Sequence, residues 1–268
     1  MGSTSFKDCD CKEGRCRDQY GFCVRCDSPE LLIAPPCVVI SKYGFAACAL
    51  FTAVSKVKCW GECSSGVCGA GQYKDIGDDA GEMGSNLKFV DLGDFPVKSI
   101  SMGSYFACAL SKMGKVKCWG VNQNGVLGSG TSRQDWSLNF PEVDLGTNAR
   151  VVQLSAGSYH VCVLLDNNSV KCWGAGDRGQ LGYGNRNNYG DSLETMRDNL
   201  PTVDLWLGEV LQLWAFHQSS CVQMSSGKVK CWGHNWRGAL GTERPDDLTR
   251  AFCCGCSAAP RACSAAPA

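Results

Sequence analysis

Hydrophobic and polar residues alternate in short runs along most of the chain, and glycine-rich segments separate these runs. The segment 97–145 contains the runs VKSISM (97–102), CAL (108–110), VKCW (116–119) and VDL (143–145). Alternation with a period of two is typical of β-strands, and frequent turn signals between the runs are typical of antiparallel sheets. This segment therefore predicts four short antiparallel strands.

The same pattern occurs four times, each time with the sequence Val-Lys-Cys-Trp-Gly. The repeated tryptophans are Trp60, Trp119, Trp173 and Trp232, at spacings of 59, 54 and 59 residues. Repeats of this length with four strands each are typical of β-propeller blades. We therefore predict an all-β, propeller-like array over residues 38–250, with four blades at about 38–93, 94–146, 147–205 and 206–250.

Two cysteines lie symmetrically about a turn in each of the last three repeats. The pairs are Cys108 with Cys118, Cys162 with Cys172, and Cys221 with Cys231. A three-residue hairpin loop places each pair directly opposite, and its third residue is then Gly114, Asn168 or Gly227. Glycine and asparagine adopt the left-handed conformation that this position requires at the lowest cost. Because directly opposed cysteines have β-carbons close enough to bond, the spacing predicts three hairpin disulfides.

The first repeat departs from this spacing. Cys48 and Cys59 enclose one more residue than the later pairs, and no glycine lies between them. We expect a disulfide here as well, within a bulged hairpin.

Alternation also assigns the repeated lysine and tryptophan to one face of their strand. Lys117 and Trp119 lie on that face, and Val116 and Cys118 lie on the other. Because neighbouring blades cover an inner strand on both faces, the tryptophan is expected to be a packing residue. The lysine is expected to lie opposite a small residue, such as Ala109, and to extend its stem to water. The equivalent pairs are Lys58 with Ala49, Lys171 with Val163, and Lys230 with Val222.

The third repeat reads Gly157-Ser-Tyr-His160, then Leu164, Val170, Trp173-Gly174 and Gly179-Gln-Leu-Gly182. These residues resemble the repeat of the regulator of chromosome condensation family. The resemblance extends over about residues 38–242, and the cysteine-bearing form Val-Lys-Cys-Trp-Gly is similar to the extracytoplasmic branch of that family. It implies a β-propeller, which in this family typically closes with seven blades. Because only four copies occur here, we expect an open arc or a partial ring.

Comparison of the copies suggests a further disulfide. Cys63 and Cys68 of the first repeat stand where Asn122 and Leu127 stand in the second. We expect a local Cys63–Cys68 bridge to replace a turn that the asparagine anchors.

The chain contains 20 cysteines among 268 residues, and they fall in even numbers within each region. Such a density indicates disulfides and an oxidising compartment, so we expect a secreted, cell-surface or organelle-lumen protein. The opening residues MGSTSFKDCD lack the apolar core of an export signal. We therefore expect that a precursor segment was removed or that the chain is incomplete.

Both ends of the chain are rich in cysteine. Residues 9–37 contain six cysteines, which favours a disulfide-stapled module over residues 1–37 whose connectivity is one of 15. Zinc is the alternative, because Cys23 and Cys26 have ligand spacing. The tail at 251–268 combines four cysteines with Ala, Pro and Ser, which indicates a flexible or partner-stabilised end.

Charge and motifs argue against several function classes. Lysine plus arginine and aspartate plus glutamate number 26 each, so no overall basic field favours a nucleic-acid partner. No apolar run is long enough to span a membrane, although the protein could sit on a membrane complex. We find no nucleophile beside a base and no phosphate-binding loop, and we expect no catalytic residue and no cofactor. Asp75, Asp78, Asp79 and Glu82 either bind calcium or form an exposed acidic loop, and their spacing favours the second.

Variable loops carry residue types that often dominate protein interfaces. The candidate partner-binding residues are Tyr73, Arg133, Trp136, Tyr183, Arg186, Tyr189, Arg197, Trp236 and Arg237. An equally good alternative is that they cover the edges of their own blades.

These features favour a non-enzymatic protein-binding or scaffold module in an oxidising extracytoplasmic compartment, either on its own or as an accessory subunit of a larger assembly with protein partners. The resemblance also implies an alternative, guanine-nucleotide exchange on a small GTPase. A light-sensing role, known for a relative, is disfavoured because its Gly-Trp-Arg-His-Thr repeat is absent.

Overall fold

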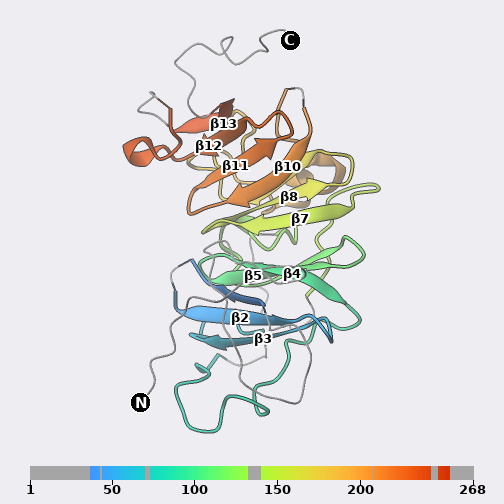
Figure 1. Cartoon of the computed structure of the whole chain (residues 1–268), viewed down its shortest axis with the longest axis vertical. Helices are drawn as coiled ribbons and strands as arrows, with labels where there is room; N and C mark the ends of the chain where they lie inside the picture. The colour runs from blue at the N-terminus through green and yellow to red at the C-terminus, as the bar shows by residue number, and fades with distance from the viewer. Residues whose placement is uncertain are drawn as a thin grey trace.

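The computed structural model describes residues 37–42, 44–69, 73–131, 140–206, 208–242 and 247–253. These residues form four antiparallel sheets, one per repeat, and Figure 1 shows the sheets stacked in chain order along the long axis of the molecule. The predicted all-β, propeller-like array of four blades is confirmed. The predicted module at 1–37 and the tail at 251–268 lie outside the described residues, except for Cys37 and residues 251–253.

The first three sheets have three strands each and the fourth sheet has four. The strands are β1 (Cys37–Ile40), β2 (Ala46–Phe51), β3 (Lys56–Gly61), β4 (Val97–Met102), β5 (Phe106–Ser111), β6 (Val116–Gly120), β7 (Val151–Ala156), β8 (His160–Leu165), β9 (Val170–Gly174), β10 (Val210–Ala215), β11 (Ser219–Met224), β12 (Val229–Gly233) and β13 (Leu248–Cys253). Single 3-10 turns lie at η1 (Gln123–Gly125), η2 (Leu193–Thr195), η3 (Arg197–Asn199) and η4 (Trp236–Gly238).

The expected fourth strand at 143–145 does not form. Glu142 makes one isolated bridge with Lys117, and the Val143 N–H donates to the Val116 carbonyl at 2.8 Å. The next residue, Asp144, turns the chain by accepting a hydrogen bond from the Gly146 N–H at 3.0 Å. Because the Asp144 side chain binds this backbone N–H, the chain bends and stops pairing with β6. The segment therefore leaves the sheet directly after Val143.

The hydrophobic core lies between the sheets. One buried cluster joins the first and second sheets, a second cluster joins the second and third, and a third joins the third and fourth. The first strands of consecutive sheets lie side by side, β1 against β4, β4 against β7 and β7 against β10. Each blade therefore buries its apolar surface only by packing on its neighbours, as repeat proteins do.

Cysteines bridge the central hairpin of every blade. In the last three blades the bonded pairs are Cys108–Cys118, Cys162–Cys172 and Cys221–Cys231, each directly opposed with a Cα–Cα distance of 4.1 Å. The expected left-handed loop residues have φ values of 80° at Gly114, 68° at Asn168 and 78° at Gly227. Turn chemistry and strand register therefore agree, and these bonded pairs are the ones that the spacing predicts.

The first blade shows how an extra residue is accommodated. Cys48 and Cys59 are bonded at a Cα–Cα distance of 4.0 Å. The expectation of a bulged hairpin is wrong, because β2 and β3 pair without a register shift from Ala46 to Phe51. The extra residue lies in the turn, where Ser55 takes a left-handed φ of 54°.

A second bridge, Cys63–Cys68, closes the next turn of this blade. The second and fourth blades hold the equivalent turn with an asparagine. There the Asn122 side-chain oxygen accepts from the Leu127 N–H at 3.1 Å, and the Asn235 oxygen accepts from the Leu240 N–H at 2.9 Å. The disulfide thus takes the place of a hydrogen bond.

Each repeated tryptophan after the first is inserted into the turn of the preceding blade. The indole N–H groups of Trp119, Trp173 and Trp232 donate to the carbonyls of Val67, Val126 and Gln180 at 2.7, 2.8 and 2.9 Å. All three side chains are fully buried, so the predicted packing role is confirmed. Close approach needs a glycine in the receiving turn, because a β-carbon at Gly128 would lie 2.9 Å from the Trp173 indole nitrogen.

The repeated lysines reach the preceding blade too, and not water as expected. Lys117 donates to the Leu92 carbonyl at 2.9 Å, Lys171 donates to Leu145 at 2.7 Å, and Lys230 donates to Leu205. Lys171 and Lys230 are buried, and desolvation lowers the pKa of both ammonium groups. The first lysine, Lys58, donates to the Gly84 carbonyl of its own blade at 3.0 Å. Repetition of the lysine is therefore structural.

A buried histidine links the third and fourth blades. His160 Nε2 lies 2.9 Å from the Ser220 hydroxyl, which itself donates to the Gln180 carbonyl at 3.0 Å. Ser220 must therefore accept from an Nε2–H, which leaves Nδ1 unprotonated and without a partner among the described residues. Burial lowers the pKa of His160 to about 3.

Two glycines in the same left-handed position offer a matched test of the hairpin turns. A β-carbon at Gly114 would lie 3.1 Å from the Val151 carbonyl oxygen and would also meet Arg150, whereas nothing lies within 4 Å at Gly227. We expect Gly227→Ala to cost about 1–2 kcal/mol of unfolding free energy from backbone strain alone. Gly114→Ala should cost more, because it adds a clash with the next blade. Urea unfolding of both oxidised variants checks this, and equal losses would contradict it.

The His160 contact predicts a dependence of stability on pH. The unfolded chain binds a proton on this ring near the ordinary pKa of about 6.5, whereas the folded chain resists protonation down to about 3. The part of the unfolding free energy that depends on a neutral His160 ring is therefore fully present above pH 6.5. It is lost as the pH falls towards 3. At pH 4.5 the loss should reach about 2–3 kcal/mol.

His160→Phe is the matched variant, because the second repeat has Phe106 at this position. We expect its unfolding free energy to fall less than that of the unmodified chain between pH 7 and 4.5. Parallel pH profiles in urea titrations would refute the assignment.

Candidate interaction surface

Two of the candidate interface residues point into their own blade. The Tyr183 hydroxyl accepts from the Cys172 N–H and donates to the Cys172 carbonyl, both at 2.7 Å. Burial raises the pKa of Tyr183. Tyr189 packs edge-on against this ring with a centroid distance of 4.9 Å, and its hydroxyl accepts from Asn185 at 3.2 Å. Both side chains serve to hold the loop onto the third blade.

Arg197 lies at the surface beside the same loop. Its Nε lies 3.2 Å from an Asp144 carboxylate oxygen, and both side chains are more than half exposed. Its backbone has a left-handed φ of 62°, and its carbonyl accepts from Lys171 at 3.3 Å. The residue thus joins the second and third repeats and keeps an exposed guanidinium.

A carboxylate with two arginines and a histidine around it lies next to the fourth blade. Asp247, whose side chain is 11% exposed, lies 3.8 Å from Arg178, 3.6 Å from Arg186 and 3.8 Å from His234. It also accepts from the Asn235 N–H at 3.2 Å. These ion pairs are long and the arginines are about half exposed, so they contribute little stability. They do bring two partly exposed arginines to the same carboxylate.

Trp236 and Arg237 lie in η4, two residues after His234 of this cluster. Trp236 is 65% exposed, and the Arg237 guanidinium carbon lies 4.6 Å from the centre of its ring. Arg237 takes a left-handed φ of 54°, as Asn124 does with 57° in the equivalent turn of the second blade. Beside Trp236 opens a pocket of about 310 Å³ lined also by Phe216, His234 and Leu240.

The candidate residues are therefore not one site. Arg186, Trp236 and Arg237 belong to one surface over the third and fourth blades, together with Arg178 and Asp247. The sequence analysis missed these last two residues, because a single arginine and a single aspartate in different loops carry no spacing signal. Tyr73, 48% exposed, belongs to the first repeat, and Arg133 and Trp136 lie outside the described residues.

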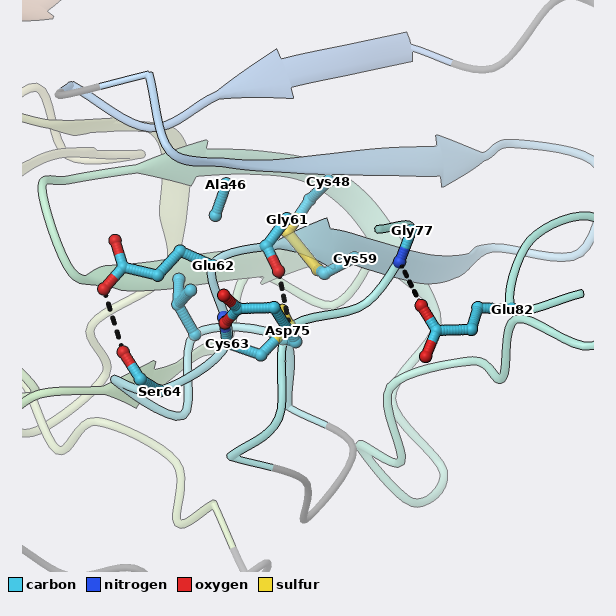
Figure 2. Close-up of a disulfide and its surroundings, with 12 residues drawn as sticks. Ala46, Cys48, Cys59, Gly61, Glu62, Cys63, Ser64, Asp75, Gly77 and Glu82 are labelled. Carbon is cyan, nitrogen blue, oxygen red and sulfur yellow. Dashed lines mark hydrogen bonds between the residues drawn. A yellow bond between two sulfur atoms is a disulfide. The ribbon is translucent and has the colours of Figure 1, made fainter. Parts of the chain in front are cut away.

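The acidic loop of the first repeat has an internal explanation (Figure 2). Asp75 accepts from the Cys63 N–H at 2.9 Å, and Glu82 accepts from the Gly77 N–H at 2.7 Å. Oxygens of Asp78, Asp79 and Glu82 lie within 4.8 Å of one another. Lys74 pairs with Asp79 at 2.8 Å and lies 3.6 Å from Glu82. The hydrogen bond from Gly77 is the main cause that lowers the pKa of Glu82.

Within the described part of the chain, no helix has the length and apolar character needed to cross a bilayer.

Comparison with known proteins identifies the repeat. Residues 97–126 and 151–180 match one family description, "Regulator of chromosome condensation (RCC1) repeat", and residues 113–164 match a second family with the same description. The chain is 38% identical over 88 residues to the "RCC1 domain-containing protein RUG3, mitochondrial" of Arabidopsis thaliana, which is 32% of this chain and 19% of that protein. It is 30% identical over 196 residues to the human "Probable E3 ubiquitin-protein ligase HERC3", which is 73% of this chain and 17% of that protein.

Solved structures share the fold. Human WBSCR16 superposes with a TM-score of 0.67 at 19% identity, over 82% of this chain and 52% of that one. Prp20p of Saccharomyces cerevisiae superposes with a TM-score of 0.62 at 18% identity, over 84% of this chain and 51% of that one.

The chain thus spans about half of these structures and no more than a fifth of RUG3 and HERC3. The repeated Trp-Gly turns, the blade contacts and these matches agree: residues 97–180 carry regulator of chromosome condensation repeats, and the chain is similar to proteins that contain this repeat.

Proposed function

We propose that the chain is a non-enzymatic protein-binding or scaffold module that works in an oxidising compartment outside the cytoplasm, as a secreted protein or an accessory subunit of a larger assembly. The observation that supports an oxidising compartment is the disulfide in the central hairpin of all four blades, together with a fifth disulfide in the first blade. Such pairs persist where thiols are not continuously reduced.

The surface around Asp247 supports protein binding. An exposed tryptophan stacked with an arginine, next to two further arginines, has the composition of interface hot spots. The loops that carry these residues lie on a blade array whose hairpins are covalently closed, so little order is lost when a partner binds. A contact surface of this kind needs no catalytic group.

Nucleotide exchange on a small GTPase is the second candidate. Prp20p, of which the chain covers 51%, binds Gsp1p and histones. The ligase named in HERC3 belongs to a protein of which the chain covers 17%, and we propose no ligase activity for the chain.

The redox state of the hairpin cysteines tests the compartment. We expect differential alkylation of the endogenous protein, with thiols blocked in intact cells and again after reduction, to label these ten cysteines only after reduction. The cysteines are Cys48, Cys59, Cys63, Cys68, Cys108, Cys118, Cys162, Cys172, Cys221 and Cys231. Labelling of the same positions without reduction would place the protein in a reducing compartment.

A site-specific cross-linker tests the contact surface. We expect a photoreactive residue at Arg186 to give an adduct with a different protein in intact cells. The control position is Met113, which is 70% exposed at the tip of the β5–β6 hairpin, and it should give no such adduct. No adduct at Arg186, combined with faster release of labelled GDP from a small GTPase by the purified chain, would favour the exchange alternative.

A further inference from the structure

The two ends of the array carry complementary halves of the contact that joins the inner blades. At each described junction, a turn offers a carbonyl and a glycine to the tryptophan of the following blade. The glycines in the first three turns are Gly69, Gly128 and Gly182. The fourth turn has the same two groups, the carbonyl of Ala239 and the left-handed Gly241 with φ of 65°. No hydrogen bond from a described residue reaches that carbonyl.

The space beside Ala239 is already formed. On the third blade, the Gln180 carbonyl accepts from both Ser220 and Trp232 of the next blade. The pocket of about 310 Å³ that includes Ala239, Leu240 and Phe216 occupies the equivalent position on the fourth blade. Phe216 and Trp236, which both line this pocket, are 48% and 65% exposed, so the pocket presents two large apolar side chains to a partner.

The missing donor lies on the first blade. The cross-strand pairs that face the preceding blade are Ala47–Trp60, Ala107–Trp119, Val161–Trp173 and Ser220–Trp232. The last three pairs are completely buried, whereas Ala47 and Trp60 are only partly buried. The Trp60 indole N–H has no hydrogen-bond acceptor among the described residues.

We propose that a second copy of this chain docks head to tail, with Ala47 and Trp60 of one copy in the Phe216–Ala239–Leu240 pocket of the other. The incoming strand has the same Val-Lys-Cys-Trp-Gly sequence as the strands already seated at the three inner junctions. The Trp60 indole would donate to the Ala239 carbonyl, as its three counterparts do. This inference rests on the proposed protein-binding function and names one partner for it. The pocket borders the surface around Asp247 at His234 and Trp236, but Arg186 does not line it.

The contact is heterologous, because donor and acceptor lie at opposite ends of the chain. Such a contact leaves one free end of each kind on every dimer, so association continues unless the arc closes into a ring. This property makes a complementation test possible.

The experiment uses the oxidised full chain in sedimentation velocity over a concentration series. The unmodified chain should form species larger than 28.8 kDa. Trp60→Ala and Phe216→Glu should each weaken self-association by about tenfold or more, because each removes one end of the contact. Mixed in equal amounts, the two variants should form a dimer and nothing larger, since each keeps one intact end.

Trp206→Ala is the matched control, because Trp206 is 53% exposed and lines neither end of the contact. It should associate like the unmodified chain, and Trp60→Phe, with circular dichroism, keeps the result readable if Trp60→Ala unfolds. A monomer at all concentrations, or oligomers unaffected by both end variants, would overturn the inference. Either result leaves the alkylation and cross-linking outcomes unchanged, so the proposed function is judged separately.

Discussion

The structure depends on one buried contact, the indole N–H of a repeated tryptophan donating to a carbonyl in the turn of the preceding blade. A buried N–H without an acceptor costs about 1–3 kcal/mol, so the ring can be buried only where that carbonyl is presented. The lysine on the same face of the strand reaches the preceding blade as well, and its ammonium is satisfied by a leucine carbonyl. Both contacts run from one blade to carbonyls of the preceding blade. Each blade therefore determines where the following blade packs.

The disulfides act inside the blades. Those between described cysteines close each central hairpin across directly opposed residues, and none of them crosses from one blade to another. Blade geometry is therefore held by covalent bonds and local turns, while blade order is held by hydrogen bonds and apolar packing. This separation leaves the loops between the blades free to differ in sequence, and the surface around Asp247 is built from such loops.

The candidate surface shows why interface residues are hard to identify from composition alone. Tyr183 follows a glycine-rich turn and Trp236 begins the equivalent turn of the next blade, yet the first binds its own strand and the second is 65% exposed. The difference arises because Tyr183 finds a partner at Cys172, 11 residues earlier. Trp236 instead borders the pocket beside the fourth blade.

The sequence by itself determined the cysteine pairs of all four hairpins and the register of the last three, because period-two alternation and a left-handed residue such as Gly114 act over a few residues. The first hairpin has no glycine in its loop, and there the expected bulge was wrong. It also determined the repeat and hence the stacked blades. Tertiary structure alone decided which distant groups meet. Lys171 donates to the Leu145 carbonyl 26 residues away, and Trp173 donates to the Val126 carbonyl 47 residues away. Asp247 pairs with two arginines that are more than 60 residues away. Alternation gives the face on which a side chain lies, but only packing of the next blade determines what that face meets.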